Sequence, residues 1–345
     1  MTRVIPMAFP PLRPRPLVSV LVANYNYAGW VGRALDSLRA QTYPRFEALV
    51  CDDGSTDESA VVVEDFARLD VRIKLLRQSN AGMAAALNTA YRNAQGSLVA
   101  LLDSDDEWAP GRLERVVARF FSAPKTGMVT HPVRAVLAGG GVLKPIHPRR
   151  LDEGWLAPSM LLGREPGLPP SSGLTFRREV AERVFPLPVH FRRCADKVAQ
   201  DRAALLAPVT PIRQPLGLYR IHGGNLTGLS GPCTPDELDR NFEFLRLLWE
   251  DRRTFIETWH GFAPDPVPWS DIESAHFHLA SMLHGRAGDP DRYLRGLPSP
   301  LLKLVWRLLM ALPRPAGRAG LKLWWTENCF KRLFRNTLDS LRATP

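Results

Sequence analysis

Three carboxylates lie directly after an apolar run early in the chain. Ser97 to Leu102 has the length and composition of a buried parallel strand, and Asp103, Asp105 and Asp106 follow it. Residues two apart on an extended backbone point the same way, so Asp103 and Asp105 can converge on one hard cation, Mg²⁺ or Mn²⁺, bridging to a diphosphate. The alternative is a solvated loop whose aspartates cap the helix after Pro110. Taken alone, the Asp-X-Asp pattern leaves both readings open.

A second acidic turn ends the predicted strand 46–51. Asp52 and Asp53 follow this strand, and Ser55 with Glu58 forms a capping box for a helix that runs to about residue 69. Ser55 and Glu58 therefore have a purely structural explanation. Asp52 and Asp53 precede the cap and remain available to a ligand.

Strands and helices alternate over the first 110 residues and must position these acids. We expect strands over 17–25, 46–51, 71–76 and 97–102, separated by helices. Such β-α repeats are typical of a parallel sheet with helices on both faces, which binds ligands beyond the carboxyl ends of its strands. The sequence contains neither G-x-G-x-x-G in its first turn nor G-x-x-x-x-G-K, which argues against a dinucleotide-dependent dehydrogenase and a P-loop NTPase.

Composition sets broad limits on the partners. The 345 residues carry a net charge of +10 at 23% charged residues, which suits nucleotide diphosphates, nucleic acid or anionic lipid headgroups. The four cysteines are far apart and show no zinc or disulfide pattern, so a reducing cytoplasm is the default. No run reaches the 18 or so apolar residues of a membrane span. We expect a protein that is either soluble or held at a membrane surface.

Four motifs together resemble one known family. They are Val18 to Asn26, Leu38 to Glu47, Cys51 to Asp57, and Asn80-Ala81-Gly82 with Leu101 to Trp108. Their order and distances resemble the nucleotide-sugar half of family-2 inverting glycosyltransferases of the GT-A fold. The resemblance implies an α/β GT-A domain, with a mixed sheet flanked by helices, that binds a nucleotide-diphosphate sugar and Mg²⁺ or Mn²⁺ as cofactor.

The resemblance also implies roles for individual residues. Tyr25 is expected to stack on the nucleotide base, and Asp53 to accept its imide hydrogen bond. Asp103 is expected to contact the ribose or to reach the metal through water, while Asp105 is the direct metal ligand. Asp106 is expected to support them. Ala23 departs from the family, because many relatives have Ser or Thr there, so one polar contact is missing.

Two acids compete for the role of catalytic base. The family usually shows Glu-Asp at the start of a helix, about twenty residues before Pro-Leu and Tyr-Arg-x-His. Counting back from Pro215 and from Tyr219-Arg220-Ile221-His222 selects Asp196, with Ala195 in place of the glutamate. Asp201 falls five residues later, inside the helix. A carboxylate at a helix start is also a routine N-cap, so the structural alternative for Asp196 stays open.

The closing motif contains His222, which has two explanations. It can be a third metal ligand or a diphosphate contact, or it can be a histidine packed beneath the site. The segment 170–178 resembles the acceptor side of the family, and its alternative is an ordinary turn before a helix.

We expect four segments along the chain. They are a flexible Pro-rich leader (1–16), the nucleotide-sugar-binding half (17–127), the acceptor-binding half (128–230) and a helical C-terminal extension (231–345). The acceptor half should open with a hairpin over 128–145, around Gly139 to Gly141, on the edge of the first sheet. Residues 299–345 are apolar, aromatic and basic together, which favours a cap on the catalytic domain, a dimer interface or a helix pair on anionic lipid.

The sequence therefore predicts an inverting, metal-dependent glycosyltransferase that acts in the cytoplasm or peripherally on the inner face of the cell membrane. The acceptor would be a saccharide, a lipid-linked or another hydroxyl group, in cell-envelope or exopolysaccharide synthesis, and we expect no nucleic-acid partner. The oligomeric state is open. One alternative is a degenerate GT-A module that binds nucleotide sugar without transfer. A sugar nucleotidyltransferase is a second, although its Gly-rich, Arg-containing loop is missing after the first strand.

Overall fold

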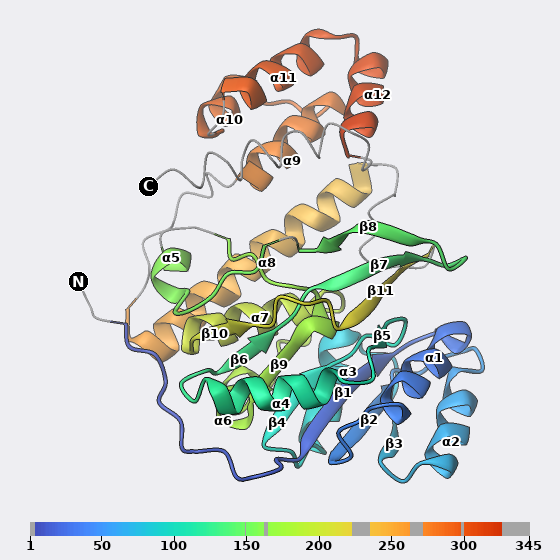
Figure 1. The fold of residues 1–345 in the computed structure, drawn as a ribbon. Helices are drawn as coiled ribbons and strands as arrows, with labels where there is room; N and C mark the ends of the chain where they lie inside the picture. Colours follow the sequence, from blue (N-terminus) through green and yellow to red (C-terminus); the bar gives the residue numbers. More distant parts are fainter. Residues whose placement is uncertain are drawn as a thin grey trace. The chain divides into compact units, whose positions relative to one another are not determined.

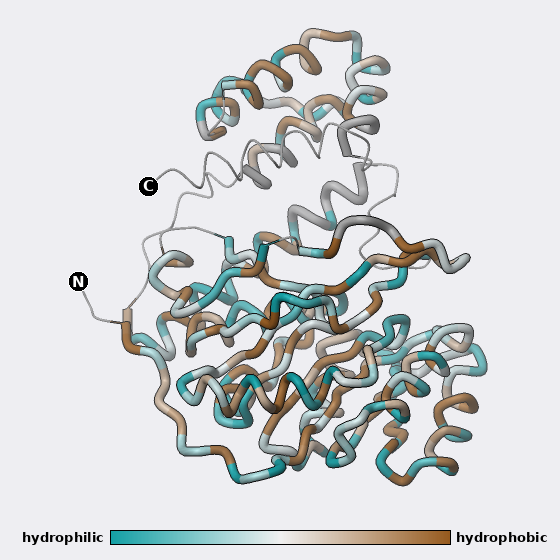
Figure 2. The backbone as a smooth tube through the Cα atoms, in the orientation of Figure 1, coloured by the Kyte–Doolittle hydropathy of each residue, from teal (hydrophilic) through white to brown (hydrophobic). Residues whose placement is uncertain are grey.

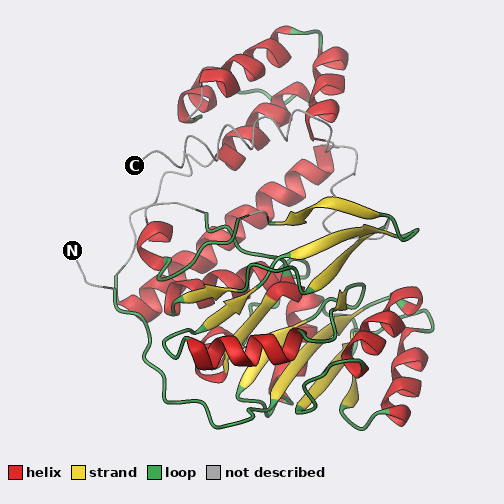
Figure 3. Cartoon of the chain, in the orientation of Figure 1, coloured by secondary structure: helices red, strands yellow, loops and turns green. Residues whose placement is uncertain are grey.

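The computed structural model describes residues 4–148, 150–161, 165–222, 235–262, 272–297 and 300–325. The chain divides into two compact units, Met1–Leu226 and Thr227–Pro345. Figure 1 follows the chain through both units, and Figure 3 separates the strands from the helices. The described part of the first unit contains two sheets and their covering helices, whereas that of the second unit is helical.

A seven-stranded sheet forms the centre of the first unit. Its strands, in spatial order, are β10 (Val209–Pro211), β6 (Met128–Thr130), β9 (Leu174–Arg177), β4 (Leu98–Leu101), β1 (Val18–Asn24), β2 (Phe46–Asp52) and β3 (Ile73–Arg77). The strands β4, β1, β2 and β3 run parallel, as the β-α repeats predicted. Strand β9 is antiparallel to both of its neighbours, β4 and β6. The sheet is therefore mixed, as expected, and its parallel strands end at one common edge.

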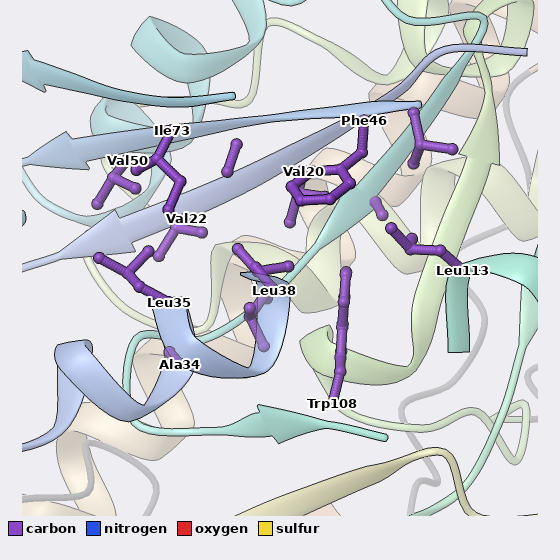
Figure 4. Packing of buried hydrophobic residues seen from close by; sticks show 14 of the residues in the cluster. Val20, Val22, Ala34, Leu35, Leu38, Phe46, Val50, Ile73, Trp108 and Leu113 are labelled. Atoms are coloured by element: carbon purple, nitrogen blue, oxygen red, sulfur yellow. The ribbon is translucent and has the colours of Figure 1, made fainter. Parts of the chain in front are cut away.

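Helices cover both faces of this sheet because strand side chains alternate between them. One face packs against α1 (Ala28–Arg39), α2 (Ser59–Leu69) and α4 (Arg112–Ser122). In Figure 4, Leu35 and Leu38 of α1 point toward Val20 and Val22 of β1. The opposite face meets α3 (Met83–Arg92) and α6 (Arg178–Val184), and α7 (Ala195–Leu206) packs against both of these helices. The remaining short helices of this unit are α5 (Ala157–Leu161) and the 3₁₀ turn η1 (Ser171–Gly173).

The expected hairpin exists, but it belongs to a second sheet. Strands β7 (Val133–Leu137) and β8 (Val142–His147) pair with each other, and β7 also pairs in parallel with β11 (Gly217–Ile221). The order of this four-stranded sheet is β5-β11-β7-β8, where β5 is Glu107–Trp108. The prediction that the whole of 128–145 lies on the edge of the first sheet is therefore wrong. Only β6 joins that sheet, because β7 finds a distant partner in β11.

The predicted capping box before α2 does not form. The N-cap of α2 is Glu58, and its side chain makes no capping hydrogen bond. The Ser55 hydroxyl instead donates to Asp52 (2.5 Å) and accepts the Asn26 N–H (2.9 Å). Ser55 therefore ties the end of β2 to the turn after β1, and a local pattern could not reveal this contact with a residue 29 positions away.

The Pro-rich leader contacts the rest of the first unit although it forms neither helix nor strand in residues 4–16. The Met7 N–H donates to the Leu206 carbonyl (2.9 Å). The Arg177 guanidinium donates to the Pro10 carbonyl (3.1 Å) and lies 5.0 Å from the ring centre of Phe9. These contacts hold residues 7–10 against α7 and β9 of the same unit.

The second unit has its own core. Its helices are α8 (Pro235–His260), α9 (Ile272–Leu283), α10 (Pro290–Gly296), α11 (Pro300–Ala311) and α12 (Arg314–Trp325). Leu279, Leu294, Trp306 and Leu321, from α9 to α12, are buried in one cluster. The part of the expected helical extension that follows residue 325 lies outside the described residues. In the described part of the chain, no helix is long and apolar enough to cross a membrane.

Candidate active site

Three acidic side chains meet where β4 ends. Asp103, Asp105 and Asp106 each place one carboxylate oxygen within 4.8 Å of the others. The Leu102 N–H donates to the Leu21 carbonyl (3.1 Å), which fixes the chain beside β1, and the Asp106 N–H donates to the Asp103 carbonyl (3.1 Å), which closes the turn. The convergence of Asp103 and Asp105 expected from their spacing is thus present, and Asp106 joins it.

Residues distant in sequence hold this turn in place. The Ser172 hydroxyl in η1 donates to Asp106 Oδ2 (2.6 Å) and accepts the Asp103 N–H (3.1 Å). Asp106 Oδ1 accepts the Arg220 N–H of β11 (3.0 Å). The indole of Trp108 donates to the Ser172 carbonyl (2.8 Å). The acidic turn is therefore held from two sides, by η1 and by β11.

The site concentrates negative charge away from water. The pKa of Asp103 lies well above its usual range. Burial is the largest cause, and the negative charges of Asp106, Asp196 and Asp105 add to it. Burial and the charge of Asp105 do the same for the pKa of Asp106, although the Ser172 hydroxyl opposes the rise. Burial also raises the pKa of Asp105. Carboxyl groups whose pKa is raised by neighbouring acids repel one another when they are ionised. A cation bound among their oxygens would relieve that repulsion.

The pairing of β5 with β11 brings His222 to this cluster. Leu218 lies opposite Glu107 in the antiparallel register, so the chain after β11 passes beside Asp105. His222 Nε2 lies 3.1 Å from Asp105 Oδ2, and the hydrogen bond opposes the rise in the pKa of Asp105. The imidazole stacks on Trp30, with ring centres 5.2 Å apart, and meets Tyr27 edge-on at 5.5 Å. His222 is therefore both packed between aromatic rings and in contact with the acidic cluster.

Asp196 and Asp201 have different surroundings. Burial raises the pKa of Asp196, the buried Ser171 hydroxyl opposes that rise, and the charge of Asp196 in turn raises the pKa of Asp103. Asp196 is therefore near enough to Asp103 for the two charges to interact. Asp201 is 1% exposed and accepts a hydrogen bond from Lys197 (2.7 Å) one turn earlier on α7. The ion pair gives Asp201 a structural partner within its own helix.

The two residues expected to contact the nucleotide base differ in accessibility. Tyr25 is 43% exposed beyond the end of β1, so its ring can stack on a planar ligand. Asp53 is buried, and its oxygens accept hydrogen bonds from the Gln78 side chain (2.7 Å) and from the N–H groups of Ala81 (2.9 Å) and Gly82 (2.7 Å). Asp53 thus orders the turn after β3, a role that its position at a strand end did not indicate.

The turn at Ala81 and Gly82, which Asp53 orders, contacts the segment that leads to Asp196. Gly82 has a φ of +93°, and a Cβ there would lie 2.7 Å from the Arg192 Cα. The Met83 N–H donates to the Arg192 carbonyl (3.0 Å), four residues before Asp196. A glycine is therefore required where the turn held by Asp53 receives the segment that leads to the candidate base.

Sequence reasoning missed a buried arginine beside the site. Arg112 is fully buried at the start of α4, lies 3.7 Å from the ring centre of Trp108, and donates to His131 Nε2 (3.1 Å) and the Thr175 hydroxyl (2.7 Å). Burial lowers the pKa of Arg112 to about 9, and burial with the Arg112 charge lowers the pKa of His131 to about 3. An arginine in the first turn of an amphipathic helix normally lies in water, so the pattern gave no signal.

Ser172→Ala should loosen the acidic turn. The variant loses the hydroxyl that Asp106 and the Asp103 N–H use, and an unsatisfied buried group costs about 1–3 kcal/mol. We expect a lower free energy of unfolding by that amount in urea denaturation, together with weaker Mn²⁺ binding by calorimetry. Ser159→Ala is the control, because the Ser159 hydroxyl donates only to Leu156 (2.8 Å). Equal Mn²⁺ affinity in parent and Ser172→Ala would show that Ser172 does not position the cluster.

The chain is similar in sequence to known glycosyltransferases. A family model described as glycosyl transferase family 2 matches residues 19–185. A glycosyltransferase of Nostoc sp. is 36% identical over 212 residues, which are 60% of this chain and 66% of that protein. The Escherichia coli protein named UDP-Glc:alpha-D-GlcNAc-diphosphoundecaprenol beta-1,3-glucosyltransferase WfgD is 42% identical over 103 residues, 30% of this chain and 40% of its own length. The matched part of this chain thus covers less than two thirds of the length of each of these two relatives.

A solved structure shares the fold. TarS residues 1–349 of S. aureus, in complex with UDP-GlcNAc, superposes with a TM-score of 0.57 at 19% identity, covering 89% of this chain and 91% of that one. The similarity confirms the expected fold class: a GT-A mixed sheet flanked by helices, with C-terminal helices.

Proposed function

Because this chain belongs to glycosyl transferase family 2, we propose that it is an inverting, metal-dependent glycosyltransferase that moves a sugar from a nucleotide-diphosphate donor to an acceptor hydroxyl. The observation that carries the proposal is the meeting of Asp103, Asp105 and Asp106 at the carboxyl end of β4, within reach of the charge of Asp196. A degenerate binding module would have no need for a fourth acid beside three that can hold a cation.

The residues present fit a divalent cation. Three carboxylates offer oxygen ligands from one turn, and oxygen is the donor that Mg²⁺ and Mn²⁺ prefer. Burial raises the pKa of each of these acids, and a bound cation would favour their ionised forms. Asp105 would be the direct ligand, Asp103 would bind directly or through water, and His222 would orient Asp105. The ion would supply positive charge to the leaving diphosphate.

The other residues would bind the donor and move a proton. Tyr25 would stack on the nucleotide base, and Asp53 would shape the base pocket through the turn that it orders. Asp196 would accept the proton of the acceptor hydroxyl at a carboxylate oxygen. The acceptor oxygen then bonds to the anomeric carbon on one face while the bond from that carbon to the diphosphate breaks on the other. Burial strengthens Asp196 as a base because it raises the pKa of the carboxyl group.

The relatives suggest classes of donor and acceptor. TarS was solved with UDP-GlcNAc, and the name of WfgD gives UDP-Glc as donor and a diphosphoundecaprenol-linked sugar as acceptor. We propose a nucleotide-diphosphate sugar and a saccharide or lipid-linked hydroxyl for this chain, in envelope or exopolysaccharide synthesis on the cytoplasmic side of the membrane. Contact of residues 299–345 with an anionic membrane is a separate proposal, because it does not depend on sugar transfer.

A thermal-shift screen of nucleotide sugars tests donor binding. A ligand present at about 100 times its dissociation constant stabilises the folded state by about 2.7 kcal/mol. We expect one nucleotide class to raise the melting temperature with Mn²⁺ and far less with EDTA. A screen in which no nucleotide sugar shifts the transition, or in which EDTA makes no difference, would contradict the proposal.

A further inference from the structure

Helix α11 exposes a row of leucines. Leu301, Leu304 and Leu308 of α11 and Leu312, which directly follows it, are spaced three, four and four residues apart. The Leu312 N–H still donates to the Leu308 carbonyl (3.3 Å), so the four side chains share one face. Their side chains are 46%, 52%, 58% and 45% exposed. Figure 2 shows hydrophobic stretches along this helix. We call these four residues the leucine face.

The leucine face is not needed for the core of the second unit. The core is formed by the other side of α11, where Leu302, Trp306 and Leu309 are buried. The exposed leucines are therefore additional to the packing that holds α11 in place. Within the described residues, this is a row of four large apolar side chains on one helix that is left in contact with solvent.

Positive charge accompanies the leucine face. Residues 300–345 contain nine Lys or Arg and two Asp or Glu, a net charge of +7 out of +10 for the whole chain. Arg307, Arg314 and Arg318 are exposed on α11 and α12, and Arg314 follows Leu312 by two residues. Arg307 lies 3.8 Å from Asp291, but both side chains are about two-thirds exposed, so the pair is weak. Exposed leucines together with exposed arginines on the same and the following helix are the pattern of a segment that lies in the interface of an anionic bilayer.

We propose that the leucine face of α11 binds an anionic lipid bilayer, with the leucines in the acyl boundary and the arginines among the headgroups. A second protein would match the leucines equally well, but the excess of positive charge favours a negatively charged planar surface. Binding of the leucine face would place the donor-binding site near acceptors that are held in a membrane. The binding itself does not depend on sugar transfer.

Vesicle flotation of the full chain tests the proposal. We expect binding to vesicles of phosphatidylglycerol and phosphatidylcholine, little binding to phosphatidylcholine alone, and release by salt as the Debye length falls from about 10 Å at 0.1 M to about 3 Å at 1 M. Leu304→Glu with Leu308→Glu should weaken binding at least about tenfold, because two charges enter the apolar layer. Arg314→Ala with Arg318→Ala should weaken it by about fivefold per residue.

The control replaces two exposed apolar residues of α2. Val61→Glu with Leu69→Glu changes side chains that are 50% and 69% exposed and should leave flotation unchanged. Circular dichroism should give all variants the melting temperature of the parent. Flotation of Leu304→Glu/Leu308→Glu equal to the parent's would overturn the proposal. It would also be overturned if light scattering showed a parent dimer that this variant splits, with no loss of vesicle binding.

Discussion

Replacing Asp196 by asparagine should lower kcat at least about a hundredfold while donor affinity stays within a few-fold of the parent. A general base acts on the proton of the acceptor in the transition state, and the bound donor does not use that carboxylate in the ground state. The structure supports the assignment, because the charge of Asp196 acts on Asp103 within the acidic cluster. Steady-state kinetics with a donor found by the screen, and calorimetry of the same donor, measure the two quantities.

Asp201→Asn is the matched control on the same helix. Five residues of helix turn the side chain by about 140° from the direction of Asp196. Asp201 is also committed to Lys197, and an asparagine oxygen can still accept that hydrogen bond. We expect kcat within about tenfold of the parent. A larger loss in Asp201→Asn than in Asp196→Asn would refute the assignment and move the base to Asp201.

Replacing Asp105 by asparagine should remove the Mn²⁺-dependent part of nucleotide binding. Residues that only orient a metal ligand typically affect metal affinity by about 10–100-fold, so loss of the ligand itself should cost at least about a hundredfold. Removing one charge from a cluster of repelling acids should not destabilise the metal-free protein, and the asparagine oxygen can still accept from His222. We therefore expect a metal-free melting temperature equal to or above that of the parent.

Asp65→Asn is the control for this variant, because Asp65 is an exposed acid on α2, paired with Arg68. Calorimetric titration of the nucleotide with and without Mn²⁺ should give Asp65→Asn the metal dependence of the parent. An Asp105→Asn protein that keeps the full Mn²⁺ dependence would remove Asp105 from the metal site.

The features that local sequence patterns predicted are those that local physics determines. The strands β1 to β4 could be predicted from their apolar residues. Acids that follow such strands lie at the carboxyl-terminal edge of a parallel sheet. The position of Asp103 and Asp105 after such a strand was therefore enough to predict that their carboxylates lie close together. The order and spacing of the four motifs also indicated the family, because they cover about 95 residues rather than one turn.

The features that escaped prediction depend on pairings between distant residues. Nothing near Asp105 shows that β5 pairs with β11 and so delivers His222, which is 117 residues away. Ser172 supports Asp106 across 66 residues, and Asp53 holds a turn 28 residues later. Ser55 was assigned to a helix cap by its spacing from Glu58, yet the tertiary contact with Asn26 took precedence. Polar side chains at strand ends have several partners within reach, and only the folded chain selects among them.

The most direct test of the account follows the anomeric configuration of the sugar that is first released. An α-linked nucleotide sugar identified by the screen is incubated with the protein and Mn²⁺, and proton NMR records the anomeric signals before mutarotation. Single displacement by a water that Asp196 deprotonates predicts that the β-anomer appears first and that EDTA stops its release. First release of the α-anomer, or release that continues unchanged in EDTA, would contradict an inverting, metal-dependent transferase.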